Sequence, residues 1–355
     1  MKLLFDNIIF ELQRAGGISV YWSELISRWK DGGAVFFGRE TENIFGAGLE
    51  LRREDEIYPR WLARRYLPFR PKVKYHESDK HIFHSSYLRY SGCPKAINVT
   101  TVHDFTYEHY VRGGRKWIHS FQKKMAVSNS AGIICVSENT KKDLLEFYPW
   151  LEGTPIRVIH NGVGDSFYPL MQNLPSGKMD LPEKPFLLFV GDRSSYKNFD
   201  AFVGLAEYFP DFALVAAGGK SIKASEAQRL KPIANRFFHF RGLSSENLNC
   251  LYNAANCLVY PSSYEGFGIP VLEAMKAGCP VVATNVSSIP EVAGDAALLV
   301  NEPTPENLAA EIRRLKDSAF RSEIIEKGIV QAANFSWDKC FEETCAFYRE
   351  LWDKE

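Results

Sequence analysis

The feature of this 355-residue sequence that most constrains its fold is a repeated alternation of short apolar runs with amphipathic stretches. The runs lack the apolar–polar alternation of a strand with one solvated face, so we expect strands buried on both faces. They are KLLFDN, AVFFG, HIFHSS, INVTTVHD, GIICVS and IRVIHNGV in the first half, and PFLLFVGD, FALVAAGG, FFHFRG, CLVYPS, PVVATN and AALLV in the second. Helices between such strands predict an α/β fold with two doubly wound parallel sheets.

A stretch between the two series lacks periodicity and is rich in proline and polar residues, FYPLMQNLPSGKMDLPEKP, which is typical of a domain boundary. The tail FSWDKCFEETCAFYRELW has apolar residues at helical spacing and predicts a helix that docks elsewhere on the chain. The sequence therefore predicts an N-terminal domain over 1–166, a linker over 167–184, a C-terminal domain over 185–334 and a C-terminal helix over 335–355.

The composition is that of a soluble globular protein, with 45% apolar and 24% charged residues. The net charge is zero, which argues against a polyanion such as nucleic acid as partner. Seven cysteines without a CxxC pair or a Cys/His cluster suit reduced thiols in the cytoplasm and give no sign of a zinc site. The N-terminus is not typical of a signal peptide, and no apolar run is long enough to predict a membrane span.

Two glutamates eight residues apart stand out in PSSYEGFGIPVLEAMKAGCPVV. Glycines and Pro270 argue against one continuous helix from Glu265 to Glu273, but proline suits the first turn of a helix that ends near Gly278. That helix would begin beyond the carboxyl ends of the strands, where doubly wound sheets bind ligands and where a helix N-terminus attracts phosphate. Carboxylates accept hydrogen bonds from sugar hydroxyls. The alternative is a simple helix-end charge at Glu265 and a surface residue at Glu273.

The stretch FVGDRSSYKNFDAF ends another expected strand and turns through Gly191. It then presents Arg193 and Lys197, two cations four residues apart. Such a pair suits a diphosphate, because arginine can hold two oxygens at once. The alternative is a solvated start of a helix.

Several stretches together resemble the retaining glycosyltransferase family 4. EGFGIPVLEAMKAGCPVVATNVSSIPEVAGDAALLV is similar to its donor-site block, VGDRSSYKN to its Arg/Lys diphosphate motif and GLSSENLNCLYNAANCLVYPS to the stretch between them. AGGISVYWSEL resembles its N-terminal glycine loop, TTVHDFTYEHY its His-Asp segment and NGV the turn before its interdomain linker. The likeness is strongest from about 155 to 300, and it implies the GT-B fold, with two Rossmann-like domains and a C-terminal helix that crosses back to the first.

The resemblance also implies residue roles. Arg193 and Lys197 would bind the diphosphate and stabilise the leaving group, Glu273 would hold the ribose, and Glu265 would contact the transferred sugar. The remaining site residues would be Gly16, Gly17, His103, Gly191, Leu243, Gly266, Phe267 and Gly268; of these, His103 would lie beneath the sugar, and Leu243 near the base. In the phosphate loop the sequence departs from some members, because SSY stands where they have a second glycine.

The family uses no obligatory metal, and this sequence has no Asp-x-Asp motif, so the expectation is a site with neither metal nor cofactor. The reaction implied is transfer of a hexose from a nucleotide sugar with retention at the anomeric carbon. Same-face attack is the favoured mechanism, and Glu265 as a covalent nucleophile is the alternative. SYKN resembles mannosyltransferases of the family, which makes GDP-mannose the first choice of donor, with UDP-sugars and dTDP-rhamnose as alternatives.

The acceptor is expected on the first domain, as a saccharide or a lipid-linked glycan of cell-surface polysaccharide synthesis. Residues 58–76 carry six Lys/Arg with aromatic residues between them. Residues 109–137 contain no Asp or Glu, and Trp117 and Phe121 are surrounded there by Arg112, Arg115, Lys116, Lys123 and Lys124. Basic segments with aromatic residues suit an anionic membrane surface, so we expect a cytoplasmic protein that binds the inner face of the membrane peripherally. The alternative is a solvated basic face with Trp61 and Trp117 in the core.

The other histidines divide into two groups. His81, His84 and His160 lie in strand-like runs and are expected in the core, whereas His109 and His119 are expected at the surface. Asp104 either orients the ring of His103 or caps the next turn. Two further functions compete with the transferase: a phosphorylase or epimerase of related fold, and a non-catalytic module that binds nucleotide sugars or anionic polymers.

Overall fold

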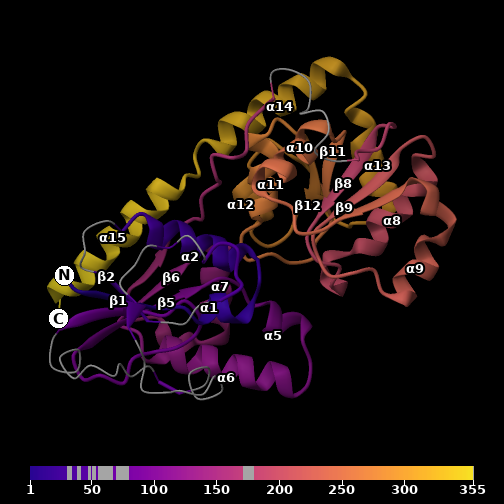
Figure 1. The fold of residues 1–355 in the computed structure, drawn as a ribbon. Coiled ribbons are helices and arrows are strands. Elements are labelled where there is room, and N and C mark those ends of the chain that lie inside the picture. Colours follow the sequence, from indigo (N-terminus) through magenta and orange to yellow (C-terminus); the bar gives the residue numbers. More distant parts are fainter. Residues whose placement is uncertain are drawn as a thin grey trace. The chain divides into compact units, whose positions relative to one another are not determined.

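The computed structural model describes residues 1–29, 34–37, 41–46, 49, 53–54, 67–68, 80–170 and 180–354. The chain divides into two compact units. The first comprises Met1–Gly162 together with Trp337–Glu355, and the second comprises Val163–Ser336. Figure 1 shows that a sheet lies at the centre of each unit. Among the described residues, no helix is both long and apolar enough to span a membrane.

The first unit is built on a parallel sheet of seven strands in the order β3-β2-β1-β4-β5-β6-β7. The strands are β1 (Leu3–Asp6), β2 (Ala34–Phe37), β3 (Arg53–Glu54), β4 (His81–His84), β5 (Ala96–Val102), β6 (Gly132–Cys135) and β7 (Ile156–Val158). Every residue of β1, β4 and β6 is buried, as expected of strands covered on both faces. Within the described residues, the helices of this unit are α1 (Ile8–Leu12), α2 (Gly17–Ser27), α5 (Thr106–Tyr110), α6 (Gly114–Ser128), α7 (Glu138–Phe147) and α15 (Trp337–Lys354).

The C-terminal helix α15 packs on the first sheet. A Cβ at Gly132 would lie 2.7 Å from the ring of Phe347, so glycine at this point of β6 lets the helix approach closely. The hydroxyl of Tyr348 lies 2.5 Å from Nδ1 of the buried His84, which ties α15 to β4. The helix therefore contributes both apolar and polar contacts to the core of the first unit.

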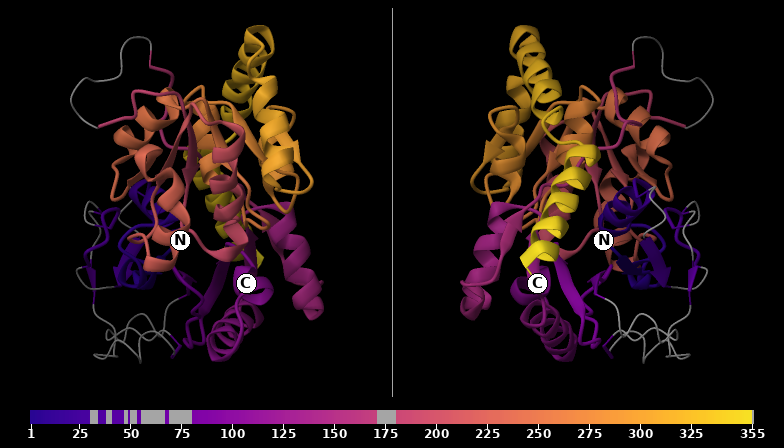
Figure 2. Two further views of the ribbon diagram at one scale, coloured as in Figure 1. Left: turned by 90° about the vertical axis from the view of Figure 1, so that its right-hand side faces the viewer. Right: turned by 90° about the vertical axis from the view of Figure 1, so that its left-hand side faces the viewer.

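The second unit has a parallel sheet of six strands in the order β10-β9-β8-β11-β12-β13. The strands are β8 (Phe186–Val190), β9 (Ala213–Ala217), β10 (Phe237–Phe240), β11 (Cys257–Tyr260), β12 (Val281–Thr284) and β13 (Leu298–Val300). The helices are α8 (Phe199–Tyr208), α9 (Ala224–Leu230), α10 (Ser245–Ala254), α11 (Ile269–Lys276), α12 (Ile289–Ala293), α13 (Pro305–Arg314) and α14 (Ser318–Ala332). Both views of Figure 2 show helices on the two faces of this sheet.

The α/β fold with two doubly wound parallel sheets is confirmed, and each of the twelve apolar runs contains a strand. The two-residue strand β3 was not predicted, because so short a segment has no pattern of its own. The units meet in sequence at Gly162–Val163 and Ser336–Trp337. Residues 171–179 of the expected linker lie outside the described residues, so the linker stays a prediction.

Two expectations about individual side chains are wrong. His119 is buried rather than at the surface, because its ring stacks on Tyr107 at 3.8 Å and its Nδ1 lies 3.8 Å from the buried Glu108 carboxylate. Trp117 is 79% exposed, which overturns the alternative that placed it in the core. Trp61 and most of the basic segment 58–76 lie outside the described residues; only Leu67 and Pro68 of that segment are described.

Candidate active site

The carboxyl edge of the second sheet is formed by turns that need unusual backbone conformations. Gly191 after β8 has a φ of 137°, and Gly218 and Gly219 after β9 have φ of 94° and 68°. A Cβ at Gly219 would lie 2.9 Å from Nη1 of Arg193 and 3.3 Å from the carbonyl oxygen of Gly191. Glycine at these positions therefore lets the two turns lie against each other and against the arginine side chain.

Lys197 ends a short 3-10 helix, η2 (Ser195–Lys197), and is followed by Asn198 in the left-handed conformation. The Asn198 side chain donates hydrogen bonds of 2.8 Å to Pro261 O and 2.7 Å to Ser263 Oγ. These bonds fasten the turn after β8 to the turn after β11. As a result Lys197 Nζ lies 2.5 Å from Glu265 Oε1 and 3.3 Å from the hydroxyl of Tyr260.

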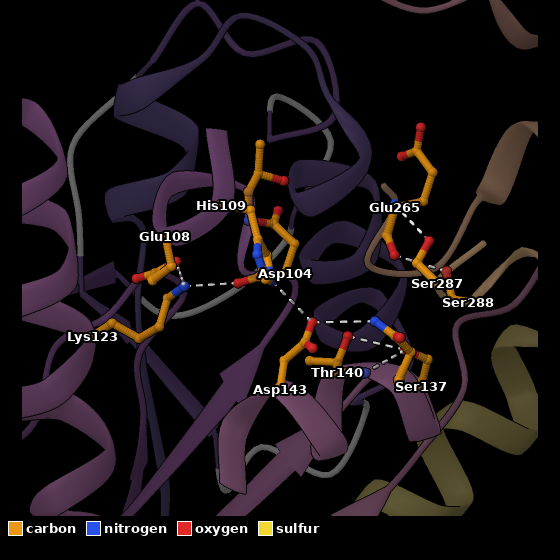
Figure 3. Close-up of polar contacts among 12 residues, drawn as sticks. Asp104, Glu108, His109, Lys123, Ser137, Thr140, Asp143, Glu265, Ser287 and Ser288 are labelled. Carbon is orange, nitrogen blue, oxygen red and sulfur yellow. Dashed lines mark hydrogen bonds and ion pairs between the residues drawn. The ribbon is translucent and has the colours of Figure 1, made fainter. Parts of the chain in front are cut away.

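The loop that carries Glu265 is held by two serines from the turn after β12. Ser287 Oγ accepts a 2.9 Å hydrogen bond from the Glu265 amide, and Ser288 Oγ lies 2.9 Å from the carbonyl oxygens of both Glu265 and Phe267 (Figure 3). Gly268 follows with a φ of 102° as the N-cap of α11, and Pro270 lies in the first turn of that helix. The start of α11 near Pro270 and its stop at Gly278 agree with the sequence expectation.

Glu273 lies within α11 and accepts a 2.9 Å hydrogen bond from the hydroxyl of the buried Tyr252. Burial raises the pKa of Glu273 to about 7, although the hydrogen bond from Tyr252 acts in the opposite direction. The carboxyl group is therefore poised between its neutral and ionised forms near neutral pH. This rules out the alternative of an ordinary surface glutamate.

Arg193 has different partners from Lys197 and Glu265. Its Nε donates a 2.9 Å hydrogen bond to Glu226 Oε1, and its Nη2 donates one of 2.6 Å to Lys220 O. Burial opposes ionisation of Glu226, but the hydrogen bonds from Arg193 and the Lys223 amide, together with the charges of both residues, outweigh it and lower the pKa of Glu226. The two cations thus lie in the same connection between β8 and α8, each paired with a different carboxylate, and their role in diphosphate binding stays a prediction.

Two further residues border the arginine. His239 Nε2 lies 2.8 Å from Gly218 O and 3.2 Å from Arg193 Nη1, and only the tautomer protonated at Nε2 can donate to that carbonyl. We assign the shorter contact as the hydrogen bond, which leaves Arg193 packed beside the ring. Arg241 donates a 2.6 Å hydrogen bond to Ser221 Oγ, which connects the turn before Leu243 to the turn after β9.

In the first unit, the expected glycine loop immediately precedes α2. Gly16 is the N-cap residue, and its carbonyl oxygen accepts hydrogen bonds from Ser19 Oγ at 2.8 Å and from the Val20 amide at 3.1 Å. Gly17 is the first residue of the helix. The two glycines therefore lie at a helix N-terminus at the carboxyl end of β1, the type of position predicted for phosphate or acceptor contacts.

His103 directly follows β5 and packs edge-on against the ring of Tyr21, with 5.0 Å between ring centroids. Burial lowers the pKa of His103 to about 4, so the ring is neutral at pH 7. Its buried Nε2 atom has no hydrogen-bond partner among the described residues. A neutral imidazole nitrogen of this kind can form a hydrogen bond with a ligand hydroxyl but supplies no positive charge.

The segment that begins at His103 is anchored from behind by a buried ion pair. Lys123 Nζ lies 2.7 Å from Glu108 Oε2 and donates a hydrogen bond of the same length to Asp104 O (Figure 3). Burial opposes ionisation of Glu108, but the hydrogen bonds of His119 and Lys123 lower the pKa of Glu108 to about 2. Asp104 Oδ1 accepts a 2.9 Å hydrogen bond from the Thr106 amide, so this residue caps the next turn, as one of the two alternatives proposed.

Sequence reasoning missed several residues that shape these two regions. Glu226 is 33 positions from Arg193, and Ser287 is 22 positions from Glu265, so no local spacing connects them. Lys123 was assigned to a basic surface although it is buried against Glu108. Among the described residues, no group of three or more His, Cys, Asp or Glu side chains lies close enough to hold a metal ion.

Two parallel, doubly wound units, each with these loops at the carboxyl edge of its sheet, are the architecture of the GT-B fold. Residues 15–167 match the family model "Glycosyltransferase Family 4", and residues 177–331 match "Glycosyl transferases group 1". The chain thus carries a glycosyltransferase family 4 domain followed by a glycosyl transferases group 1 domain.

Curated relatives include the O-antigen chain mannosyltransferase B of Escherichia coli, which is 34% identical over 183 residues, 49% of this chain and 48% of that protein. The O-antigen chain mannosyltransferase RfbU of Salmonella typhimurium is 28% identical over 275 residues, 75% of this chain and 72% of that protein. The chain thus spans about half the length, or less, of the first relatives it matches. The structure of Anabaena Alr3699/HepE in complex with UDP-glucose has a TM-score of 0.77 at 16% identity, covering 99% of this chain and all of that one, and supports the fold alone.

Proposed function

We propose that this protein transfers mannose from GDP-mannose, with retention at the anomeric carbon, to a saccharide or lipid-linked glycan in cell-surface polysaccharide synthesis. The observation that carries the proposal is the Lys197–Glu265 pair in the loops just before α11, together with Glu273 inside that helix. The choice of mannose is supported by the O-antigen mannosyltransferases among the curated relatives.

Each group has a chemical task in this proposal. Lys197 stabilises the negative charge that develops on the departing diphosphate, and the N-terminus of α11 adds to the same positive field. Glu273 accepts hydrogen bonds from the ribose hydroxyls, and Glu265 accepts them from the transferred sugar. Because Glu265 pairs with Lys197, a bound donor would have to replace that contact with contacts to its own phosphate and hydroxyl groups.

Retention follows if acceptor and leaving group share one face of the sugar. The bond between the anomeric carbon and the diphosphate breaks, the acceptor oxygen bonds to the same carbon from the same side, and its proton passes to the departing phosphate. Among the described residues, Glu265 is the carboxylate nearest to Lys197, and its ion pair with that lysine suits a positioning role better than that of a covalent nucleophile. Neutral His103 contributes a hydrogen bond to the sugar rather than a charge.

The acceptor side of the proposal rests on the first unit. On and just before α6, Arg112, Arg115 and Lys124 are exposed, and no ion pair is found for them within the described part of the chain. Trp117 on the same helix is exposed to solvent. Cations with an exposed tryptophan suit an anionic membrane surface, so we place the enzyme at the cytoplasmic face of the membrane, where a lipid-linked acceptor would be presented.

The test measures base preference and product together. Thermal-shift titration of the full chain with GDP, UDP, dTDP and ADP should give the largest stabilisation with GDP, because a ligand that binds only the folded state raises the melting temperature. Incubation with GDP-mannose and an oligomannose acceptor, followed by NMR, should give an α-linked product with or without EDTA. A larger thermal shift with UDP or dTDP than with GDP would mean that the donor carries that nucleotide instead. A β-linked product would contradict retention.

A further inference from the structure

An apolar pocket of about 520 Å³ lies in the first unit, and no step of the proposed transfer uses it. It is lined mainly by hydrophobic side chains from three segments, among them Leu67, Leu88, Trp117, Ile118, Phe121 and Met125. The volume falls within the range of about 300–1,000 Å³ that is usual for small-molecule sites. Because this lining offers water few hydrogen-bond partners, the pocket suits an apolar ligand.

One wall of the pocket is fixed by a buried polar network around Asp6. Asp6 Oδ1 accepts hydrogen bonds from the Ser86 amide at 2.9 Å and from Ser86 Oγ at 2.7 Å, and Oδ2 lies 3.3 Å from Arg89 Nη1. Leu88, between these residues, has a φ of 47°, which residues other than glycine rarely adopt. Arg89 Nε donates a 3.3 Å hydrogen bond to Leu67 O. The network therefore holds both leucines in the wall without any ligand.

The opposite wall is α6, and this helix is anchored from its inner side. Lys123 binds Glu108 as described above, and His119 Nε2 lies 3.0 Å from the hydroxyl of Tyr87. The residues that face the pocket and solvent are large and apolar, with Trp117 79%, Ile118 52% and Phe121 64% exposed. Figure 1 shows α6 at the periphery of the first unit. The pocket is thus preformed between two rigid walls and rimmed by exposed hydrophobic side chains.

The charges beside the pocket indicate what kind of apolar ligand fits. Arg115 lies three residues before Ile118 and Lys124 three residues after Phe121, so each cation neighbours a lining residue on the helix surface. Residues 109–137 contain no Asp or Glu. Lys124 Nζ lies 5.1 Å from the centre of the Trp150 ring, which leaves Arg115 as the cation at the pocket. A hydrocarbon chain that ends in a phosphate matches this arrangement, with the chain in the pocket and the phosphate at Arg115.

We propose that this pocket binds one hydrocarbon chain of a membrane-borne lipid phosphate, the carrier of the acceptor glycan. The inference rests on the proposed function for the identity of the glycan carrier, but not for the chemistry of the pocket. The pocket would thus contact the hydrocarbon chain of the lipid directly, in addition to the general attraction between basic residues and an anionic surface.

The test is isothermal titration calorimetry of the full chain with farnesyl phosphate, which is kept below its critical micelle concentration. We expect saturable binding at one site that millimolar inorganic phosphate does not displace. Ile118→Asn should weaken this binding about tenfold, because a buried aliphatic contact is replaced by a polar group. Phe121→Asn is the second variant, and the high exposure of both residues leaves the fold intact, which melting curves verify.

The matched control is Val330→Asn on α14, which changes an exposed aliphatic residue of the second unit (69% exposed) and should leave farnesyl phosphate binding unchanged. Absent or non-saturable binding of farnesyl phosphate would overturn the proposal. Equal affinity of Ile118→Asn and the unaltered protein for farnesyl phosphate would overturn it as well. Equal binding of farnesyl phosphate and inorganic phosphate would show a charge effect alone and would also overturn it. Thermal shifts with nucleotides report the donor site separately, so a failure of the pocket and a failure of the proposed function give different patterns.

Discussion

The two units contain lysine–glutamate pairs of similar geometry but different surroundings. Lys123 and Glu108 in the first unit lie 2.7 Å apart, with side chains that are 2% and 3% exposed. Lys197 and Glu265 in the second unit lie 2.5 Å apart, and both side chains are 11% exposed. The first pair also binds the main chain at Asp104, whereas the second lies at loop ends on the edge of a sheet. We infer that the first pair is structural and that the second can open for a ligand.

The largest expected effect breaks the first pair. Lys123→Met should lower the free energy of unfolding by about 3–5 kcal/mol, because it leaves the Glu108 carboxylate buried without its cation. Chemical denaturation followed by circular dichroism measures the change. The double variant Lys123→Met/Glu108→Gln should recover part of the loss. A change below about 1 kcal/mol in the single variant would mean that water reaches Glu108 and that the pair is not structural.

The second largest effect concerns the Lys197–Glu265 pair, and we expect it in the catalytic rate rather than in the free energy of unfolding. Lys197→Ala should lower kcat about 10²–10³-fold, as removal of a group that stabilises developing charge does, while the free energy of unfolding changes little. Steady-state kinetics with the preferred nucleotide sugar and denaturation of the same sample measure both. Lys276→Ala, which removes an exposed ion pair with Asp165 in the same unit, is the matched control and should leave both values near those of the unaltered protein.

If Lys197→Ala destabilised the protein as strongly as Lys123→Met and left kcat unchanged, the contrast between the pairs would be refuted. The second pair would then be structural too. A loss of kcat in the Lys276→Ala control would show that the assay responds to surface charge in general rather than to the position of Lys197.

The sequence predicted the strands and the start of α11 because these depend on local patterns. Apolar runs report burial on both faces of a sheet, and Pro270 and Gly278 mark the ends of a helix through their own backbone preferences. The family resemblance also implied that Lys197 and Glu265 belong to one site, but it could not show that they pair directly, because they are 68 positions apart.

Burial of charged residues was the harder property to predict. Lys123 stands beside other basic residues in the sequence and was read as part of a basic surface, yet it points inward to Glu108, fifteen positions earlier. His119 was misplaced for the same reason. A charged or polar residue is buried when the fold supplies a partner, and partners from another element leave no local pattern in the sequence.

The smallest effect concerns Glu273, a carboxyl group of the second unit whose hydrogen-bond partner is the neutral Tyr252 instead of a cation. Because burial raises its pKa to about 7, lowering the pH from 8 to 6 should protonate it in the ligand-free protein. If the ionised form is the one that accepts the ribose hydroxyls, the Kd for the nucleotide should rise about tenfold over this range. Calorimetric titration at several pH values measures this dependence.

The variant Glu273→Gln separates this effect from other titrations, since its side chain keeps its size but cannot ionise. Its affinity should be lower than that of the unaltered protein at pH 8, similar at pH 6 and flat between them. The folded-state pKa of Glu273 lies above its ordinary value, so ionisation destabilises the ligand-free fold as the pH rises from about 4.5 to 7. Glu273→Gln should therefore be the more stable protein at pH 8 but the weaker binder. Equal pH dependence in both proteins would assign the titration to another group and remove Glu273 from the ribose contact.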